Sequence, residues 1–334
     1  MIVSLVIPTY GRDSVLGETV AALLRLTPPA DELLVVDQTA EHENATRDRL
    51  AAWDRAGAIR WLRLAQPSIT AAMNRGLAEA SGEIVLFVDD DIVPTPNLVA
   101  AHRAVYGRFP EAWAVVGRVL QPEDGDENAE GLNTEMLKSE GAQTTTRLPE
   151  AGKVRGEKGK SGRSFSILRE DLDFHFNSTA PAWVSNVMAG NLSVRRERAL
   201  TVGGFDENFT PPVSYRFETE FAKRLVAAGG RIRFEPAAAI RHLRAARGGT
   251  RSVGSHLTSS SPLHGQGDYY YALLCGRGWD RARYILRRPF REVSTRFHLQ
   301  HPWWIPIKFL GELRALALAC RRYRRRDGRG GRAA

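Results

Sequence analysis

The sequence predicts an α/β protein in which helices flank a mainly parallel sheet, and three observations support this. Short apolar runs at 2–7, 33–36 and 84–88 have the length and composition of buried strands. Segments with helical spacing of apolar residues lie between these runs. Polar residues, including three adjacent aspartates, follow where the runs end. Strands that are apolar on both faces and alternate with helices are typical of a parallel sheet covered by helices.

The expected elements follow one another closely in the first part of the chain. Pro8 ends the first apolar run, and Gly82 supplies a turn before the last one. Ligands of such sheets bind at the carboxyl ends of the strands, where Thr9, Asp37 and the aspartates 89–91 fall. The predicted order is strand 2–7, helix 14–26, strand 33–36, helix 44–56, strand 59–64, helix 69–80 and strand 84–88.

The second part of the chain is less regular. Residues 121–180 are rich in Gly, Glu, Lys, Ser and Thr, so we expect a long loop or insertion of the kind that closes over a substrate. Residues 244–265 resemble a linker, and 268–326 is expected to be helical and basic. Between these regions the pattern predicts order at 183–194, a helix from about 195, a helix over 218–228 and short strands at 232–235 and 239–242.

Composition places the chain among ordinary globular proteins. Of its residues, 43% are hydrophobic and 25% are charged, and its length of 334 residues is enough for one large domain and a smaller appendage or for two domains. The two cysteines, Cys275 and Cys320, form no CxxC pair and no zinc spacing. The first residues lack the pattern of a signal peptide, and no stretch offers about 20 uncharged apolar residues. We therefore expect a cytoplasmic protein.

The formal charge of +9 is unevenly placed. Residues 321–332 contain seven arginines and one aspartate, so this tail carries +6 and the rest of the chain +3. A nucleic-acid-binding protein is expected to be basic over a whole face, so no nucleic-acid partner is predicted. A basic tail of this kind suits contact with an anionic surface.

The segment IVLFVDDDIVP, residues 84–94, gives the first chemical prediction. Three adjacent carboxylates repel one another, and their pKa values rise unless positive charge lies nearby. A divalent cation such as Mg²⁺ supplies that charge, and it is commonly bound by one or two carboxylates together with substrate phosphates. The alternative is that Asp91 caps the following turn and Asp90 is solvated, since Asp is common at turns.

Several segments in order resemble family 2 glycosyltransferases, which have the GT-A nucleotide-diphosphosugar-binding fold. The resemblance extends over about residues 1–242 and is specific to the family, but not to a substrate. It rests on VIPTYGR (6–12), VVDQT (35–39), AAMNRGLAEASGEIVLFVDDDIVP (71–94), AGNLSVRRERALTVGGFDENF (189–209) and ETEFAKRLVAAGGRIRFEPAAAIRH (218–242).

The resemblance implies a donor site and a cation, Mn²⁺ or Mg²⁺. In the family's pattern the loop after the first strand holds the nucleotide, and the acid that ends the second strand contacts its base. Where relatives carry Ala-Arg-Asn, this chain has Ala72-Met73-Asn74. The implied donor residues are Pro8, Thr9, Tyr10, Asp37, Asn74, Asp89 and Asp90, and the implied metal ligands are Asp91 and His242. A lone histidine is also commonly structural.

The resemblance also implies an acceptor side and a catalytic base. Gly190, Asn191 and Asp206 correspond to the acceptor-side wall, although the glycines here also suit a simple turn. Glu218 stands where relatives have the aspartate that acts as the base. The alternative for Glu218 is an acidic residue in the first turn of a helix, where the helix dipole favours it.

The expected protein is thus a metal-dependent, inverting glycosyltransferase. It would move sugar from a nucleotide-diphosphosugar to a hydroxyl of a saccharide or lipid-linked acceptor, in cell-surface polysaccharide or glycoconjugate synthesis. The expected division is a catalytic domain at 1–243, with a variable acceptor-side loop at 121–180, and a basic helical extension at 244–334. The alternatives are a sugar nucleotidyltransferase, for which PTYGRDS is poor in glycine, or a non-catalytic nucleotide-sugar-binding module.

The end of the chain predicts a membrane partner. The segment HPWWIPIKFLGELRALALACRRYRRR mixes tryptophans and leucines with arginines, a composition that suits a bilayer interface. We expect residues 301–332 to contact an anionic membrane, which would make the protein peripheral at the inner face of the cell membrane. The alternatives are a helix packed on the catalytic domain with a disordered tail, or a tail that binds RNA.

Overall fold

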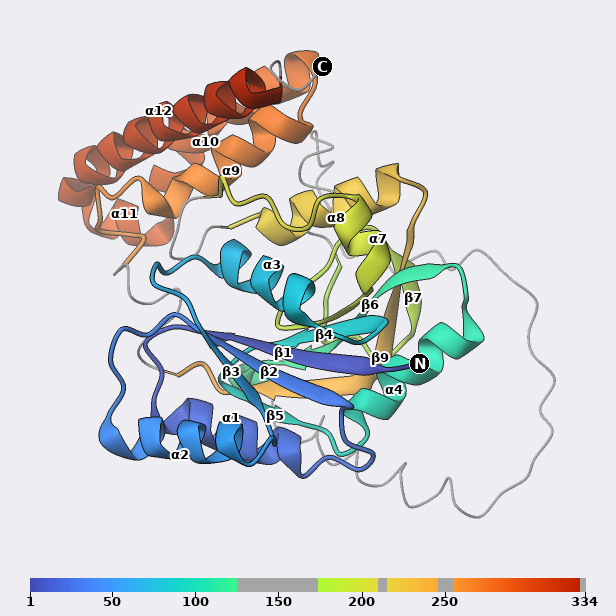
Figure 1. The fold of residues 1–334 in the computed structure, drawn as a ribbon. Helices are drawn as coiled ribbons and strands as arrows, with labels where there is room; N and C mark the ends of the chain where they lie inside the picture. The colour runs from blue at the N-terminus through green and yellow to red at the C-terminus, as the bar shows by residue number, and fades with distance from the viewer. Residues whose placement is uncertain (125–173, 210–214, 246–254, 331–334) are drawn as a thin grey trace.

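The computed structural model describes residues 1–124, 174–209, 215–245 and 255–330. A central sheet lies between two layers of helices, and a further group of helices lies beyond one of these layers (Figure 1). One face of the sheet is covered by α1 (Ser14–Leu24), α2 (Asn44–Arg55) and α4 (Leu98–Arg108), and the other by α3 (Ile69–Glu79), α7 (Arg196–Thr201) and α8 (Phe217–Ala227).

Among the described residues the sheet has nine strands, and its first half is parallel as predicted. The strand order is β3-β2-β1-β4-β8-β6-β9-β5, and β7 pairs with β9. β8 is antiparallel to both of its neighbours, β4 and β6, so the second half of the sheet is mixed. The strands are β1 (Val3–Thr9), β2 (Glu32–Asp37), β3 (Arg60–Arg63), β4 (Ile84–Val88), β5 (Ile92–Pro94), β6 (Ala112–Leu120), β7 (Ala182–Val184), β8 (Asn191–Arg195) and β9 (Arg231–His242).

Alternation along the buried strands fills a separate hydrophobic core on each face. In β1, Leu5 and Ile7 belong to the core beneath α1, α2 and α4, whereas Val6 belongs to the core beneath α3 and α8. All three side chains are fully buried. This two-sided burial explains why the strand sequences are continuous apolar runs.

The C-terminal helices form a bundle next to α8 (Figure 1). Tyr269, Tyr270 and Tyr271 of α9 are completely buried, and the ring of Tyr270 meets that of Phe209 at 5.0 Å. The bundle therefore shares its core with the α/β part of the chain. Within the described chain, no helix combines the length and apolarity needed to cross a bilayer. The bundle consists of α9 (Leu263–Cys275), α10 (Gly278–Val293), α11 (Arg296–Gln300), the 3-10 turn η3 (Pro302–Trp304) and α12 (Ile305–Gly330).

Some elements differ from those predicted. Helix α4 and strand β6 were not assigned from the sequence, and α9 begins at Leu263, inside the expected linker. The two short strands predicted at 232–235 and 239–242 are one strand, because β9 continues through an irregular register opposite Gly117 and Arg118. The predicted acceptor-side loop at 121–180 falls mostly outside the described residues.

Candidate active site

Three consecutive aspartates follow β4, and their side chains have different surroundings. The side chains of Asp90 and Asp91 are 10% and 2% exposed, whereas that of Asp89 is 47% exposed. Thr9 Oγ1 donates to Asp90 at 2.6 Å, and Arg12 lies 3.6 Å from Asp90 and 3.1 Å from Asp91. One buried guanidinium thus offsets the repulsion between the two buried carboxylates.

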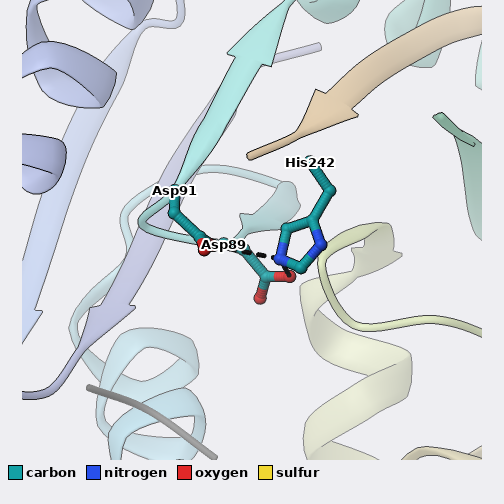
Figure 2. Close-up of side chains that lie close together, drawn as sticks. All are labelled: Asp89, Asp91 and His242. Atoms are coloured by element: carbon teal, nitrogen blue, oxygen red, sulfur yellow. Dashed lines mark ion pairs between the residues drawn. The ribbon is translucent and has the colours of Figure 1, made fainter. Parts of the chain in front are cut away.

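The imidazole of His242 lies close to two of these carboxylates, those of Asp89 and Asp91 (Figure 2). Because β5 pairs antiparallel with β9 and places Ile92 opposite His242, the imidazole reaches the residues just before β5. Its Nε2 lies 3.1 Å from Asp91 Oδ1 and 3.8 Å from Asp89 Oδ2. One ligand atom from each of the three residues falls within 4.8 Å of the others. Two carboxylate oxygens and one imidazole nitrogen fit a divalent cation such as Mn²⁺.

Electrostatics distinguish the two buried aspartates. Burial raises the pKa of Asp90 to about 7, because Arg12 and Thr9 offset only part of the loss of hydration. Burial also acts to raise the pKa of Asp91, but the hydrogen bond and charge of His242 bring it below the ordinary value. Asp91 is therefore ionised at neutral pH, and the ionised form is the one that binds a cation. Asp90 instead accepts the buried hydrogen bond from Thr9.

Glu218 lies beside this cluster, behind the backbone of Ala189 and Gly190. The amide of Ala189 donates to Glu218 Oε1 at 2.6 Å, and a Cβ at Gly190 would overlap Asp89 Oδ2. Burial raises the pKa of Glu218 to about 7, and the charge of Asp89 raises it further against the hydrogen bond from Ala189. The structure thus brings the predicted base, the predicted wall glycine and the predicted acidic cluster together.

The predicted nucleotide loop after β1 is fixed to the loop after β2. The carbonyl of Thr9 accepts from the backbone N–H and from the side-chain amide of Gln38. Gly11, at φ +65°, donates its N–H to Thr39 Oγ1 at 2.9 Å. Pro8 and Tyr10, on either side of Thr9, are partly exposed at the carboxyl edge of the sheet.

Asp37, predicted to contact the nucleotide base, already has protein partners at both oxygens. Oδ1 accepts from the amide of Thr39, and Oδ2 lies 2.9 Å from both His42 Nε2 and Trp61 Nε1. Its side chain has no exposed surface. A contact between Asp37 and a base stays a prediction, and it requires this carboxylate to exchange one of these partners.

Asn74 and Asp206 hold a loop together. The amide of Asn74 donates to the carbonyl of Phe205 and to Glu207, both at 2.8 Å, and its oxygen accepts from the N–H of Phe205. Asp206 Oδ2 accepts from Tyr270 at 3.0 Å and pairs with Arg326 at 2.9 Å. Both side chains act within the protein here, so donor binding by Asn74 and acceptor binding by Asp206 stay predictions.

Asn191, which was predicted to present its amide to an acceptor sugar, has protein partners for its amide in this structure. Asn191 is 0% exposed, and its Nδ2 donates to the carbonyls of Arg118 and Ala238 while its Oδ1 contacts His102 Nε2. The side chain belongs to a buried polar network between strands. It stabilises the sheet behind the site, and acceptor binding by Asn191 stays a prediction.

The N-terminus of α8, which carries Glu218, is anchored to the C-terminal bundle. Arg216 precedes α8 in the left-handed conformation, at φ +76°, and is 6% exposed. Its guanidinium pairs with Asp268 of α9 at 3.2 Å, and Arg288 of α10 pairs with the other oxygen of Asp268 at 3.0 Å. We call Arg216, Asp268 and Arg288 the anchoring network.

Arg12 is a residue of the candidate site that was not singled out from the sequence. It stands in the quoted segment VIPTYGR, but nothing in one sequence shows which of many arginines is buried. Electrostatics could have predicted it, because three aspartates at the end of one strand require positive charge nearby. Arg12 follows the end of the neighbouring strand β1.

The mixed sheet flanked by helices, with its acidic cluster and histidine at the strand ends, agrees with the expected GT-A fold. The chain belongs to glycosyl transferase family 2, because the sequence model of that family matches residues 4–171, half of the chain.

A curated relative, validoxylamine A glucosyltransferase of Streptomyces hygroscopicus subsp. limoneus, is 25% identical over 213 residues. The match covers 63% of this chain and 45% of the relative, so the chain spans about half the length of that protein.

Solved structures confirm the fold. Staphylococcus aureus TarS 1–349 in complex with UDP-GlcNAc aligns with a TM-score of 0.53 at 14% identity, over 97% of this chain and 72% of TarS. The mannosyltransferase PcManGT of Pyrobaculum calidifontis, solved with GDP-Man and Mn²⁺, aligns at 0.50 and 18% identity, over 95% and 74%. GalNAc-T7, solved with UDP, GalNAc and Mn²⁺, aligns at 0.51 and 15% identity, over 72% and 44%.

Proposed function

We propose that this glycosyltransferase is cation-dependent and inverting, and that it transfers a sugar from a nucleotide-diphosphosugar to a hydroxyl of a saccharide or lipid-linked acceptor in glycoconjugate synthesis. The observation that carries this proposal is the convergence of Asp89, Asp91 and His242 beside Glu218. The ligands of similar structures support it, since TarS was solved with UDP-GlcNAc and PcManGT with GDP-Man and Mn²⁺.

Asp89, Asp91 and His242 would hold the cation. When bound, it neutralises the charge that develops on the departing nucleoside diphosphate. Asp91 is ready for this role because its lowered pKa keeps it ionised.

Glu218 supplies the base. The Ala189 amide fixes Oε1, which leaves Oε2 to take the proton of the acceptor hydroxyl as that oxygen attacks the anomeric carbon. The bond from that carbon to the diphosphate oxygen breaks on the opposite face, so the configuration inverts. A pKa of about 7 makes Glu218 a stronger base than an ordinary glutamate.

The test is release of nucleoside diphosphate from a panel of UDP- and GDP-sugars, with Mn²⁺ or Mg²⁺ and a crude lipid and saccharide acceptor fraction. We expect turnover by the native protein, and loss of turnover in Asp91→Asn and in Glu218→Gln. Asp48→Asn, at an exposed position in α2, is the control.

Two results would overturn the proposal. One is turnover in Glu218→Gln equal to that of the control. The other is pyrophosphate release from a nucleoside triphosphate and a sugar phosphate. The anomeric configuration of the product, measured by NMR, tests inversion separately.

A further inference from the structure

The positive charge of this protein is concentrated in its C-terminal helical bundle as a whole. Residues 255–334 contain 16 Lys and Arg against 5 Asp and Glu, a net charge of +11, of which the tail 321–332 supplies +6 and residues 255–320 supply +5. With a total of +9, residues 1–254 carry a net charge of −2. A basic bundle is thus attached to a slightly acidic catalytic region.

The same bundle exposes large apolar side chains. On α10, Leu286 and Phe290 are 62% and 64% exposed, and Trp303 of η3 is 62% exposed. On α12, Leu310 and Leu313 are 43% and 47% exposed. We call these five residues the apolar face.

The apolar face spans two adjacent helices. The ring of Phe290 on α10 meets that of Phe309 on α12 at 5.8 Å, so the two helices lie side by side there (Figure 1). Lys308 and Glu312, which are buried and paired with each other, define the inward side of α12. Leu310 and Leu313 are turned away from that side by the helical repeat of 3.6 residues.

Exposed arginines lie on α10 and α12, which carry the apolar face, and on α11, which comes just before η3 in the chain. Arg287 on α10, Arg296 on α11 and Arg314 on α12 are exposed. The acidic residues of these helices are largely neutralised: Glu292 pairs with Arg291, and Glu312 is buried against Arg288 and Lys308. An apolar face on helices that also expose arginines complements a surface that is apolar inside and negatively charged at its edge.

We infer that the apolar face docks this protein on an anionic lipid bilayer, with Trp303 at headgroup depth and the exposed arginines on lipid phosphates. Tryptophan favours that depth, and arginines strengthen binding to anionic lipid. The bundle would lie on the bilayer, in keeping with its lack of a spanning helix among the described residues.

This surface differs from the segment 301–332 expected from the sequence. Trp303 lies just before α12, whose first residue, Ile305, is about 32 Å from Arg326 along the helix at 1.5 Å per residue. Arg326 is paired with Asp206 of the catalytic region. The docking surface therefore combines α10, η3 and the first half of α12, and the Arg326 end of α12 faces the catalytic region instead.

The test is co-sedimentation of the full chain with phosphatidylcholine vesicles that contain or lack phosphatidylglycerol. We expect binding to the anionic vesicles, and weak binding to the neutral ones. Leu310→Ser/Leu313→Ser should bind at least about tenfold more weakly, because two leucines no longer enter the interface. Each of Arg287→Gln and Arg296→Gln should weaken binding about fivefold.

The matched control is Leu200→Ser/Val226→Ser, which changes apolar residues of the catalytic region with 42% and 43% exposure. Its vesicle binding should equal that of the native protein, and circular dichroism should show that both double variants are folded. Equal binding by the two double variants would overturn the inference. So would a native protein that binds neither kind of vesicle.

A native dimer that Leu310→Ser/Leu313→Ser converts to a monomer, with no vesicle binding by either, would instead assign the face to a second copy of the chain and would also overturn the inference. The vesicle assay contains no sugar donor, so its failure leaves the proposed transfer reaction standing. Likewise, failure of the protein to turn over a sugar donor would not contradict docking on the bilayer.

Discussion

Replacing Asp268 with asparagine should weaken both the stability and the turnover of this enzyme. Asp268 balances Arg216 and Arg288, whose side chains are 6% and 4% exposed. Burial acts to raise the pKa of Asp268, but the two guanidinium groups and the hydroxyl of Tyr284 bring it below the ordinary value. Asparagine keeps the shape and removes the charge, which leaves two buried cations with one fewer counter-ion.

Loss of one partner of a buried ion pair costs about 3–5 kcal/mol, so we expect the free energy of unfolding to fall by about 3 kcal/mol for this conservative change. Because the folded-state pKa is lowered, the stabilisation from Asp268 is present above the ordinary carboxyl pKa and is lost as the pH falls through the lowered one. The native protein should therefore lose stability in acid more steeply than Asp268→Asn does.

Turnover should fall because Arg216 sets the entry into α8, and Glu218 lies two residues further on. A displacement of the base by about 1 Å reduces kcat on the order of 10²-fold. The KM for the donor should change little, since the predicted donor residues lie on other elements.

Urea denaturation at several pH values and steady-state kinetics measure these two effects. Asp280→Asn, in the first turn of α10, is the control. A fall in unfolding free energy below about 1 kcal/mol, the range of exposed ion pairs, would refute the reasoning. So would an unchanged kcat in a destabilised variant.

Three further predictions concern the site itself. Since Glu218 must be ionised to act and its pKa is about 7, kcat/KM of the native enzyme should rise about tenfold per pH unit below 7 and level off above it, whereas Glu218→Gln should lose about 10³-fold and show no such step. Asp91→Asn and His242→Ala should each weaken Mn²⁺ binding at least about tenfold by isothermal titration calorimetry, and unchanged affinity in both would disprove the ligand assignment. Gly190→Ala should reduce cation affinity and turnover together, because the added Cβ overlaps Asp89 Oδ2, and a fully active variant would show that this contact does not matter.

The sequence predicted the parallel half of the sheet and the edge at which the site lies. Apolar runs and the polar residues that follow them are local signals that can be read from the sequence. For Thr9, Asp89 and Asp91, the position at the end of a strand was enough to place them at the carboxyl edge of the sheet. The antiparallel position of β8 between β4 and β6 depends on contacts between residues far apart in the sequence. The local pattern of residues 191–195 therefore does not predict it.

Side-chain direction was the main limit of the prediction. Asn191 stands in a segment that lines the site, but it is the first residue of β8 and turns into the sheet. The sequence predicted two short strands at 232–235 and 239–242, whereas the irregular register between them lets β9 continue to His242. This continuation is what carries His242 to Asp91.

The ring contact between Phe209 and Tyr270 bears on which fragments of this protein can be prepared. A polypeptide cut at 243 would expose to water an aromatic seam that the bundle now covers, including Phe209, which is 1% exposed in the whole chain. Such a fragment should aggregate when expressed by itself. The C-terminal bundle is thus part of the folding unit of the enzyme and cannot be trimmed away as a dispensable appendage.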